Sequence, residues 1–223
     1  MRSGSHLLPN VVSRRLLDHW PVRPSLVLLL GCVLFASAQA QSVKPVLILL
    51  GPPASGKSTQ AALIQKQYGF AMITREQLMK DDPSALARQK QPAIRGVEPR
   101  VDPALNTLFM KRLEQTDISK GLLLDGYPST KDHSDFFVKV IQEKGLKIPL
   151  VLRLEVPDDV VRKRLKGQKT DQIEQDLKDY HRETDFLSSY FPKAEIVKID
   201  GTQKEQAVFA EIRKAIDEYL KKP

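Results

Sequence analysis

The chain has 223 residues, of which 35 are basic and 27 acidic, and this length, less a leader of 40 residues, holds one ordinary domain but not two. The leader contains four arginines and one aspartate, so the remaining 31 basic and 26 acidic residues give a net charge of +5, too diffuse to indicate a nucleic-acid-binding protein. The only cysteine, Cys32, lies in the leader, which excludes disulfides from the rest of the chain, and the histidines lack the spacing of metal ligands.

Residues 1–40 have the pattern of a secretory signal peptide. Arginines precede an apolar run at 25–38, shorter than the roughly 20 residues of a membrane-spanning helix, and the small-residue pattern Ala38-Gln39-Ala40 ends it. We therefore expect a cleaved signal, export to a periplasmic or extracellular compartment, and no stable membrane association afterwards. The alternatives are an uncleaved membrane anchor and an organellar transit peptide, and bulky Leu30 argues against lipid attachment at Cys32.

A phosphate-binding loop follows the first expected strand, residues 45–50, whose branched apolar residues suit a strand buried on both faces. The sequence GPPASGKS at 51–58 matches the pattern G-x-x-x-x-G-K-[ST]. Its glycines let backbone N–H groups surround phosphate oxygens at the start of a helix, expected at 59–68. Lys57 adds a charge near the outer phosphates and Ser58 a hydroxyl for Mg²⁺. The alternative is a plain glycine turn between strand and helix.

The remaining elements alternate along the chain. Thr74 suits the cap of a helix through Lys80, and Pro157 the first position of a later helix. Strands are expected at 70–73, 122–125, 150–156 and 195–200, helices at 74–80, 102–116, 130–144, 157–165, 171–189 and 203–221, and an irregular insertion at 81–101. The alternation predicts one α/β domain at 41–223, with a parallel sheet covered by helices on both faces and a ligand at the carboxyl ends of its strands.

The sequence resembles adenylate kinase and the wider nucleoside monophosphate kinase family over nearly all of residues 45–221. The resemblance rests on GPPASGKSTQ (51–60), Thr74, LLLDGYPST (122–130), LEVPDDVVRKRLKG (154–167), DYH (179–181) and VKIDGT (197–202). It implies a P-loop kinase fold with a five-stranded parallel core, an acceptor-binding flap and a lid. It also implies phosphoryl transfer from Mg·ATP to a nucleoside monophosphate by a protein that we expect to be a monomer.

Several residue roles follow from the resemblance. Asp125 would organise Mg²⁺ together with Ser58, Lys57 and Asp125 would serve catalysis, and Arg164 would pack on the donor adenine. Thr74, Gly126 and His133 would contact the acceptor. The residues that would bind ATP are Gly51, Pro52, Ala54, Ser55, Gly56, Lys57, Ser58, Thr59 and Arg164.

Positively charged residues of the family pattern are missing. Ser129 and Met79 stand where the family has arginines on the acceptor side, and Gln168 stands at a lid arginine. Asp176 replaces a catalytic arginine, and the lid is reduced to a few residues at 167–170. Cations around the moving phosphoryl group contribute on the order of 10³–10⁵ in rate, so these losses should matter. Substitute charges are available from Arg75, Lys80, Arg95, Arg100, Arg162, Lys163, Lys166, Lys169 and Arg182.

Three functions remain open at this point. The first is a phosphotransferase of the monophosphate kinase type that uses ATP, Mg²⁺ and nucleotide acceptors. The second is a catalytically impaired kinase fold that binds nucleotide without efficient transfer. The third is a nucleotide hydrolase, in which water takes the place of the acceptor.

Overall fold

The computed structural model describes residues 43–82, 103–191 and 194–222. These belong to a compact unit spanning Val43–Pro223. The expected signal peptide at 1–40 and nearly all of the expected insertion at 81–101 lie outside the described residues. In the described ranges, no helix has both the length and the apolar character needed to span a membrane.

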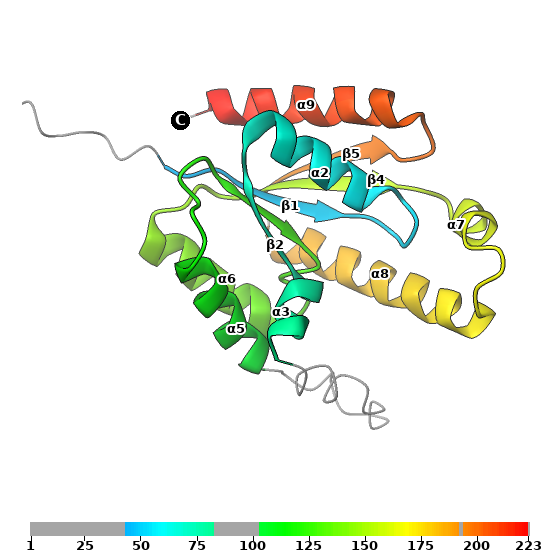
Figure 1. Ribbon diagram of the computed structural model, residues 1–223, viewed down its shortest axis with the longest axis horizontal. Helices are drawn as coiled ribbons and strands as arrows, with labels where there is room; N and C mark the ends of the chain where they lie inside the picture. The colour runs from blue at the N-terminus through cyan, green and yellow to red at the C-terminus, as the bar shows by residue number, and fades with distance from the viewer. Residues whose placement is uncertain (1–42, 83–102, 192–193, 223) are drawn as a thin grey trace, which may run out of the picture. The chain divides into compact units, whose positions relative to one another are not determined.

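A five-stranded sheet forms the centre of this unit (Figure 1). The strands are β1 (Val46–Leu50), β2 (Ala71–Thr74), β3 (Leu122–Asp125), β4 (Leu150–Glu155) and β5 (Glu195–Asp200). They are all parallel, in the order β2-β3-β1-β4-β5. Asp125 pairs with Leu49 on one side and Thr74 on the other, so β1, β2 and β3 end at the same level. The expected five-stranded parallel α/β fold is confirmed.

Helices cover both faces of the sheet (Figure 1). In the described ranges they are α2 (Lys57–Tyr68), α3 (Arg75–Asp81), α5 (Pro103–Glu114), α6 (Lys131–Lys144), α7 (Asp158–Arg164), α8 (Thr170–Tyr190) and α9 (Glu205–Lys221). One core cluster joins α2 and α9 to one face, and another joins α3, α5, α6 and α8 to the other. Pro157 caps α7 instead of occupying its first position, because its ψ of 142° is extended. Thr74 caps α3, as expected.

The strand β1 shows why helices must pack on both faces of the sheet. All five of its residues are buried. Because successive side chains of a strand point to opposite faces, Leu47 and Leu49 pack towards α2 and α9, whereas Ile48 joins the opposite cluster. An apolar run without alternation is the signature of such a central parallel strand.

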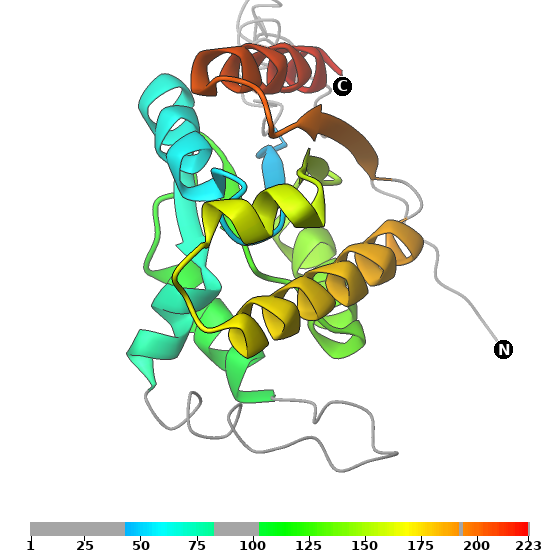
Figure 2. The same ribbon diagram turned by 90° about the vertical axis from the view of Figure 1, so that its right-hand side faces the viewer.

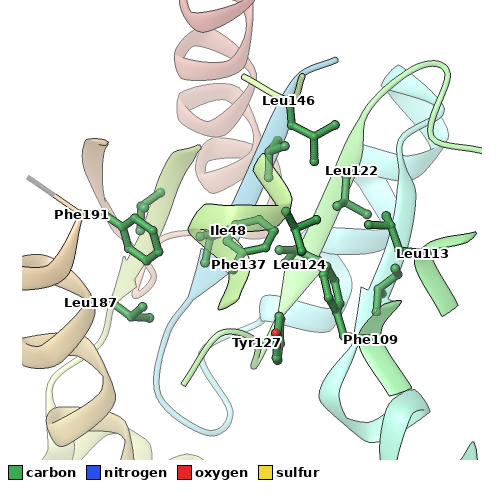
Figure 3. Close-up of a cluster of buried hydrophobic side chains, with 14 of the residues drawn as sticks. Ile48, Phe109, Leu113, Leu122, Leu124, Tyr127, Phe137, Leu146, Leu187 and Phe191 are labelled. Carbon is green, nitrogen blue, oxygen red and sulfur yellow. The ribbon is translucent and has the colours of Figure 1, made fainter. Parts of the chain in front are cut away.

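An aromatic group fixes the turn that follows β3 (Figure 3). Tyr127 is fully buried and stacks on Phe109 of α5 with ring centroids 4.4 Å apart, and Phe137 of α6 meets Phe109 edge-on at 5.7 Å. The Tyr127 hydroxyl donates to Oδ1 of Asn106 at 2.7 Å. The peptide between Tyr127 and Pro128 is cis. These contacts anchor the residues directly after Asp125.

Phe109→Ala should therefore destabilise the protein by about 3–5 kcal/mol, since it removes a fully buried ring and leaves a cavity beside Tyr127. Urea unfolding at equilibrium measures this as a lower midpoint with an unchanged slope. Leu220→Ala is the matched control, because Leu220 is 41% exposed on α9 and should cost under about 1 kcal/mol. An equal loss of unfolding free energy in the two variants would contradict the burial of Phe109 in the core.

Candidate active site at the carboxyl edge of the sheet

The expected phosphate loop runs from β1 to α2, at the edge of the sheet that faces the viewer in Figure 2. Gly56 has φ of 94°, a left-handed conformation suited to glycine, and Ala54 has φ of 55°, which is uncommon for a residue with a side chain. A Cβ atom on Gly51 would lie 2.7 Å from Oγ of Ser55 and 3.0 Å from Cβ of Leu154. Gly51 is therefore required by this close packing.

The start of α2 leaves its backbone donors available within the described structure, since no side chain caps it there. The first N–H groups of a helix lack partners inside the helix and carry the positive end of its dipole. Ser58 and Thr59 are exposed on the first turn, beside these donors. Together with the left-handed loop, this end of α2 is suited to an anion such as phosphate.

Lys57 lies across the loop. Its Nζ donates to the carbonyl oxygens of Gly51 at 2.5 Å and Pro52 at 2.9 Å. Burial lowers the pKa of Lys57, while the negative charges of Asp125 and Glu183 act in the opposite direction. The ammonium group is thus held at the edge of the sheet, close to two carboxylates.

Asp125 ends β3 on the same edge. Burial raises the pKa of Asp125, the positive charge of Lys57 lowers it, and Glu76 raises it. The described residues contain no group of three or more His, Cys, Asp or Glu side chains able to hold a metal ion by themselves. Mg²⁺ usually combines one or two carboxylates with phosphate oxygens and water, so the oxygen donors Asp125 and Ser58 fit a nucleotide-bound Mg²⁺.

Arg164, the last residue of α7, connects α7 to the phosphate loop. Its guanidinium donates to the carbonyl oxygen of Ala54 at 2.9 Å and to that of Gly201 at 3.0 Å. The sequence separates these three residues widely, and the fold brings them together beside the loop. The planar guanidinium is therefore placed where an aromatic base could stack on it.

The expected acceptor residues lie on the other side of Asp125. The Thr74 hydroxyl accepts from the Gln77 amide at 3.0 Å, and the Gln77 side chain accepts from the Thr74 amide at 2.9 Å, a complete capping box. His133 is buried, with Nδ1 3.3 Å from Oγ of Ser129 and its ring 5.2 Å from that of Tyr127. The acceptor roles of Thr74, Gly126 and His133 remain predictions.

The residues at the expected lid and at the expected arginine positions make local contacts. Only residues 165–169 connect α7 to α8, and Arg162 of α7 donates to Glu174 of α8 at 2.7 Å. Met79 packs against the core, and Asp176 accepts from Gln172 of the same helix at 2.7 Å. Three of the expected substitute cations form ion pairs within or between α7 and α8: Arg162 with Glu174, Lys163 with Asp159, and Arg182 with Asp179.

Sequence reasoning missed Glu183. Its carboxylate accepts from Nη1 of Arg75 at 3.1 Å, although 108 residues separate the two. Burial raises the pKa of Glu183, and Arg75 lowers it less than burial raises it. The one sequence signal is the spacing of Asp176, Asp179 and Glu183, which places three carboxylates along one side of α8.

This shift of Glu183 gives the free protein a pH-dependent stability. A carboxyl group whose pKa is raised on folding stabilises the protein below its ordinary pKa, and that stability is lost as the pH rises through the folded pKa. The charged groups that face Glu183 are Arg75, Asp179 and Arg182, with Lys57 nearby. Glu183→Gln removes the carboxyl group, so the variant should not lose this stability as the pH rises.

We therefore expect the melting temperature of Glu183→Gln, relative to wild type, to rise between about pH 4 and about pH 8. Glu174→Gln is the matched control on α8. Its hydrogen bond to Arg162 lowers the pKa of Glu174, so the relative melting temperature of that variant should fall slightly over the same interval. Parallel trends for both variants, measured by calorimetry without nucleotide, would contradict the burial of Glu183.

The similarity of this chain to known proteins covers the elements that form the site. The adenylate kinase family profile matches residues 49–196, which contain the loop, Asp125, α7 and α8. The adenylate kinase of Brucella ovis is 30% identical over 192 residues, covering 76% of this chain and 97% of that protein. That of Micrococcus luteus is 31% identical over 169 residues, covering 70% of this chain and 82% of that protein. The chain belongs to the adenylate kinase family.

Proposed function

We propose that this protein transfers the γ-phosphoryl group of Mg·ATP to a nucleoside monophosphate or another small phosphorylated acceptor. One observation carries the proposal: at the carboxyl edge of the parallel sheet, Lys57 and Arg164 both donate to carbonyl oxygens of the phosphate loop, and Asp125 is close enough to act on the pKa of Lys57. In open parallel sheets, this edge is where ligands bind. Family membership supports the same reaction class.

The residues of the loop would bind and orient the donor. The backbone N–H groups at the start of α2 would donate hydrogen bonds to the phosphate oxygens, and Lys57 would move from the carbonyl oxygens of Gly51 and Pro52 to the outer phosphates. Since phosphoryl transfer needs little covalent chemistry from the protein, this positioning and charge stabilisation would supply most of the catalysis.

Mg²⁺ would be held by Ser58 and Asp125 together with phosphate oxygens. The family implies its use, and when bound it neutralises charge that develops on the phosphates. Asp125 is suited to this role because it is half-buried near Lys57 and belongs to no group of three or more metal-binding side chains within the described ranges.

A second candidate function, nucleotide binding without efficient transfer, is favoured by the acceptor side. Met79 packs into the core, Ser129 is buried beside His133, and Asp176 bears a negative charge on α8. Met79, Ser129 and Asp176 all lack the positive charge with which an arginine would stabilise a moving phosphoryl group. The two functions make opposite predictions about turnover.

Phosphorus NMR of the protein with Mg·ATP and AMP, CMP, GMP, UMP or dTMP in turn should reveal a diphosphate product with at least one monophosphate. Lys57→Ala should lower the rate of its formation by about 10²–10³-fold, because the variant loses the cation nearest the outer phosphates. Lys66→Ala, which removes an exposed lysine from the last turn of α2, is the matched control and should leave the rate unchanged.

Intact ATP with every monophosphate would contradict the transferase and favour the binding protein. Release of free phosphate without any acceptor would indicate a hydrolase instead. A rate insensitive to Lys57→Ala would show that the loop is not the donor site.

A further inference from the structure

The centre of the site contains an ion pair that no family role explains. Arg75 and Glu183 join α3 to α8, and their side chains are 33% and 23% exposed. The pair is therefore partly buried, and the Glu183 carboxylate is desolvated more than Arg75 compensates, since its pKa is raised. Structural stability alone is therefore a poor reason for the pair.

Arg75 lies among the residues expected to contact the acceptor. It follows Thr74 directly and begins α3 at the end of β2. A Cβ atom on Gly126 would lie only 3.1 Å from Cβ of Arg75 and 3.7 Å from its Cδ, so the arginine side chain passes over Gly126 beside Asp125. A guanidinium at this point is suited to bind a phosphate with two parallel hydrogen bonds.

Glu183 approaches the same arginine from α8. The negative charge of Glu183 raises the pKa of Lys57, and the Glu183 carboxylate accepts a hydrogen bond from Arg75. Glu183 therefore lies near both cations at the edge of the sheet. The carboxylates of Asp125 and Glu183 lie near the two cations Lys57 and Arg75, and the charge of Glu76 also acts on Asp125. A bound monophosphate would bring further negative charge, which a carboxylate at contact distance repels.

We propose that Arg75 binds the phosphate of the acceptor, in place of the arginines replaced by Met79 and Ser129, and that Glu183 competes with that phosphate for Arg75. The inference rests on the proposed function and assigns its acceptor site. An acceptor phosphate would displace the Glu183 carboxylate from Arg75. Arg75 therefore supplies the binding energy for the acceptor phosphate, and Glu183 lowers the acceptor affinity by competing for Arg75.

The test is isothermal titration of the whole protein with AMP, CMP, GMP, UMP and dTMP, in the absence of ATP, so that the readout does not depend on transfer. Glu183→Gln should tighten binding of the preferred monophosphate about tenfold, because it frees Arg75 and keeps the side-chain shape. Arg75→Gln should weaken binding about tenfold or more, because it removes a charged hydrogen-bond donor. Glu174→Gln, which removes a carboxylate from an outer ion pair of α8, is the matched control and should change nothing.

The double variant Arg75→Gln with Glu183→Gln separates competition from general repulsion. If Glu183 acts through Arg75, the double variant should bind like Arg75→Gln alone, within about twofold. Equal tightening by Glu183→Gln with and without Arg75 would overturn the assignment, as would unchanged or weaker binding in Glu183→Gln. Absence of monophosphate binding to both wild type and Glu183→Gln would also overturn it.

The outcomes keep the two proposals apart. Transfer in wild type without tightening in Glu183→Gln would leave the proposed function standing and remove this inference. Tightening without transfer in any variant would establish the Arg75 site and remove the transferase. Melting curves of each variant confirm that a change in affinity is not a loss of folding.

Discussion

The site depends on the desolvation of charge at the end of a parallel sheet. Lys57 and Asp125 lie where β1 and β3 end together, and burial shifts the pKa of each towards its neutral form. Their mutual attraction opposes both shifts, and the carbonyl oxygens of Gly51 and Pro52 satisfy the ammonium group. A phosphate that enters this edge would exchange with these two carbonyl oxygens for the Lys57 ammonium group, which the fold already holds beside the loop.

The helix α8 carries acidic residues towards the site. Asp176, Asp179 and Glu183 place carboxylates along the side of α8 that includes the contact with Arg75, and only residues 165–169 connect α7 to α8. The ion pair of Arg162 with Glu174 and a hydrogen bond between His181 and Asp158 join α7 to α8, so the Arg162 cation is engaged there. The pair of Arg75 on α3 and Glu183 on α8 therefore adds to the charges of Lys57 and Asp125 at this edge of the sheet.

The fold was accessible from the sequence because each element has a local signal. Residues adjacent in the sequence determine the local features of the fold, such as the buried strand β1, the glycine loop and the Thr74 cap. The Arg75–Glu183 pair and the bond from Arg164 to Ala54 cross more than 100 residues, and no local pattern encodes such contacts. His133 is more deeply buried than its expected acceptor role suggests, because packing on Tyr127 follows from the tertiary turn. The signal peptide and the ligand roles stay predictions.

The most direct test of the account is an amide NMR titration of the protein, first with Mg·triphosphate and then with Mg·ATP. If the carboxyl edge binds the donor, triphosphate should shift the amide signals of residues 54–59. ATP should in addition shift Gly201, which Arg164 connects to the loop. Shifts confined to other parts of the chain, or no shifts with either ligand, would contradict a nucleotide phosphate site at this edge.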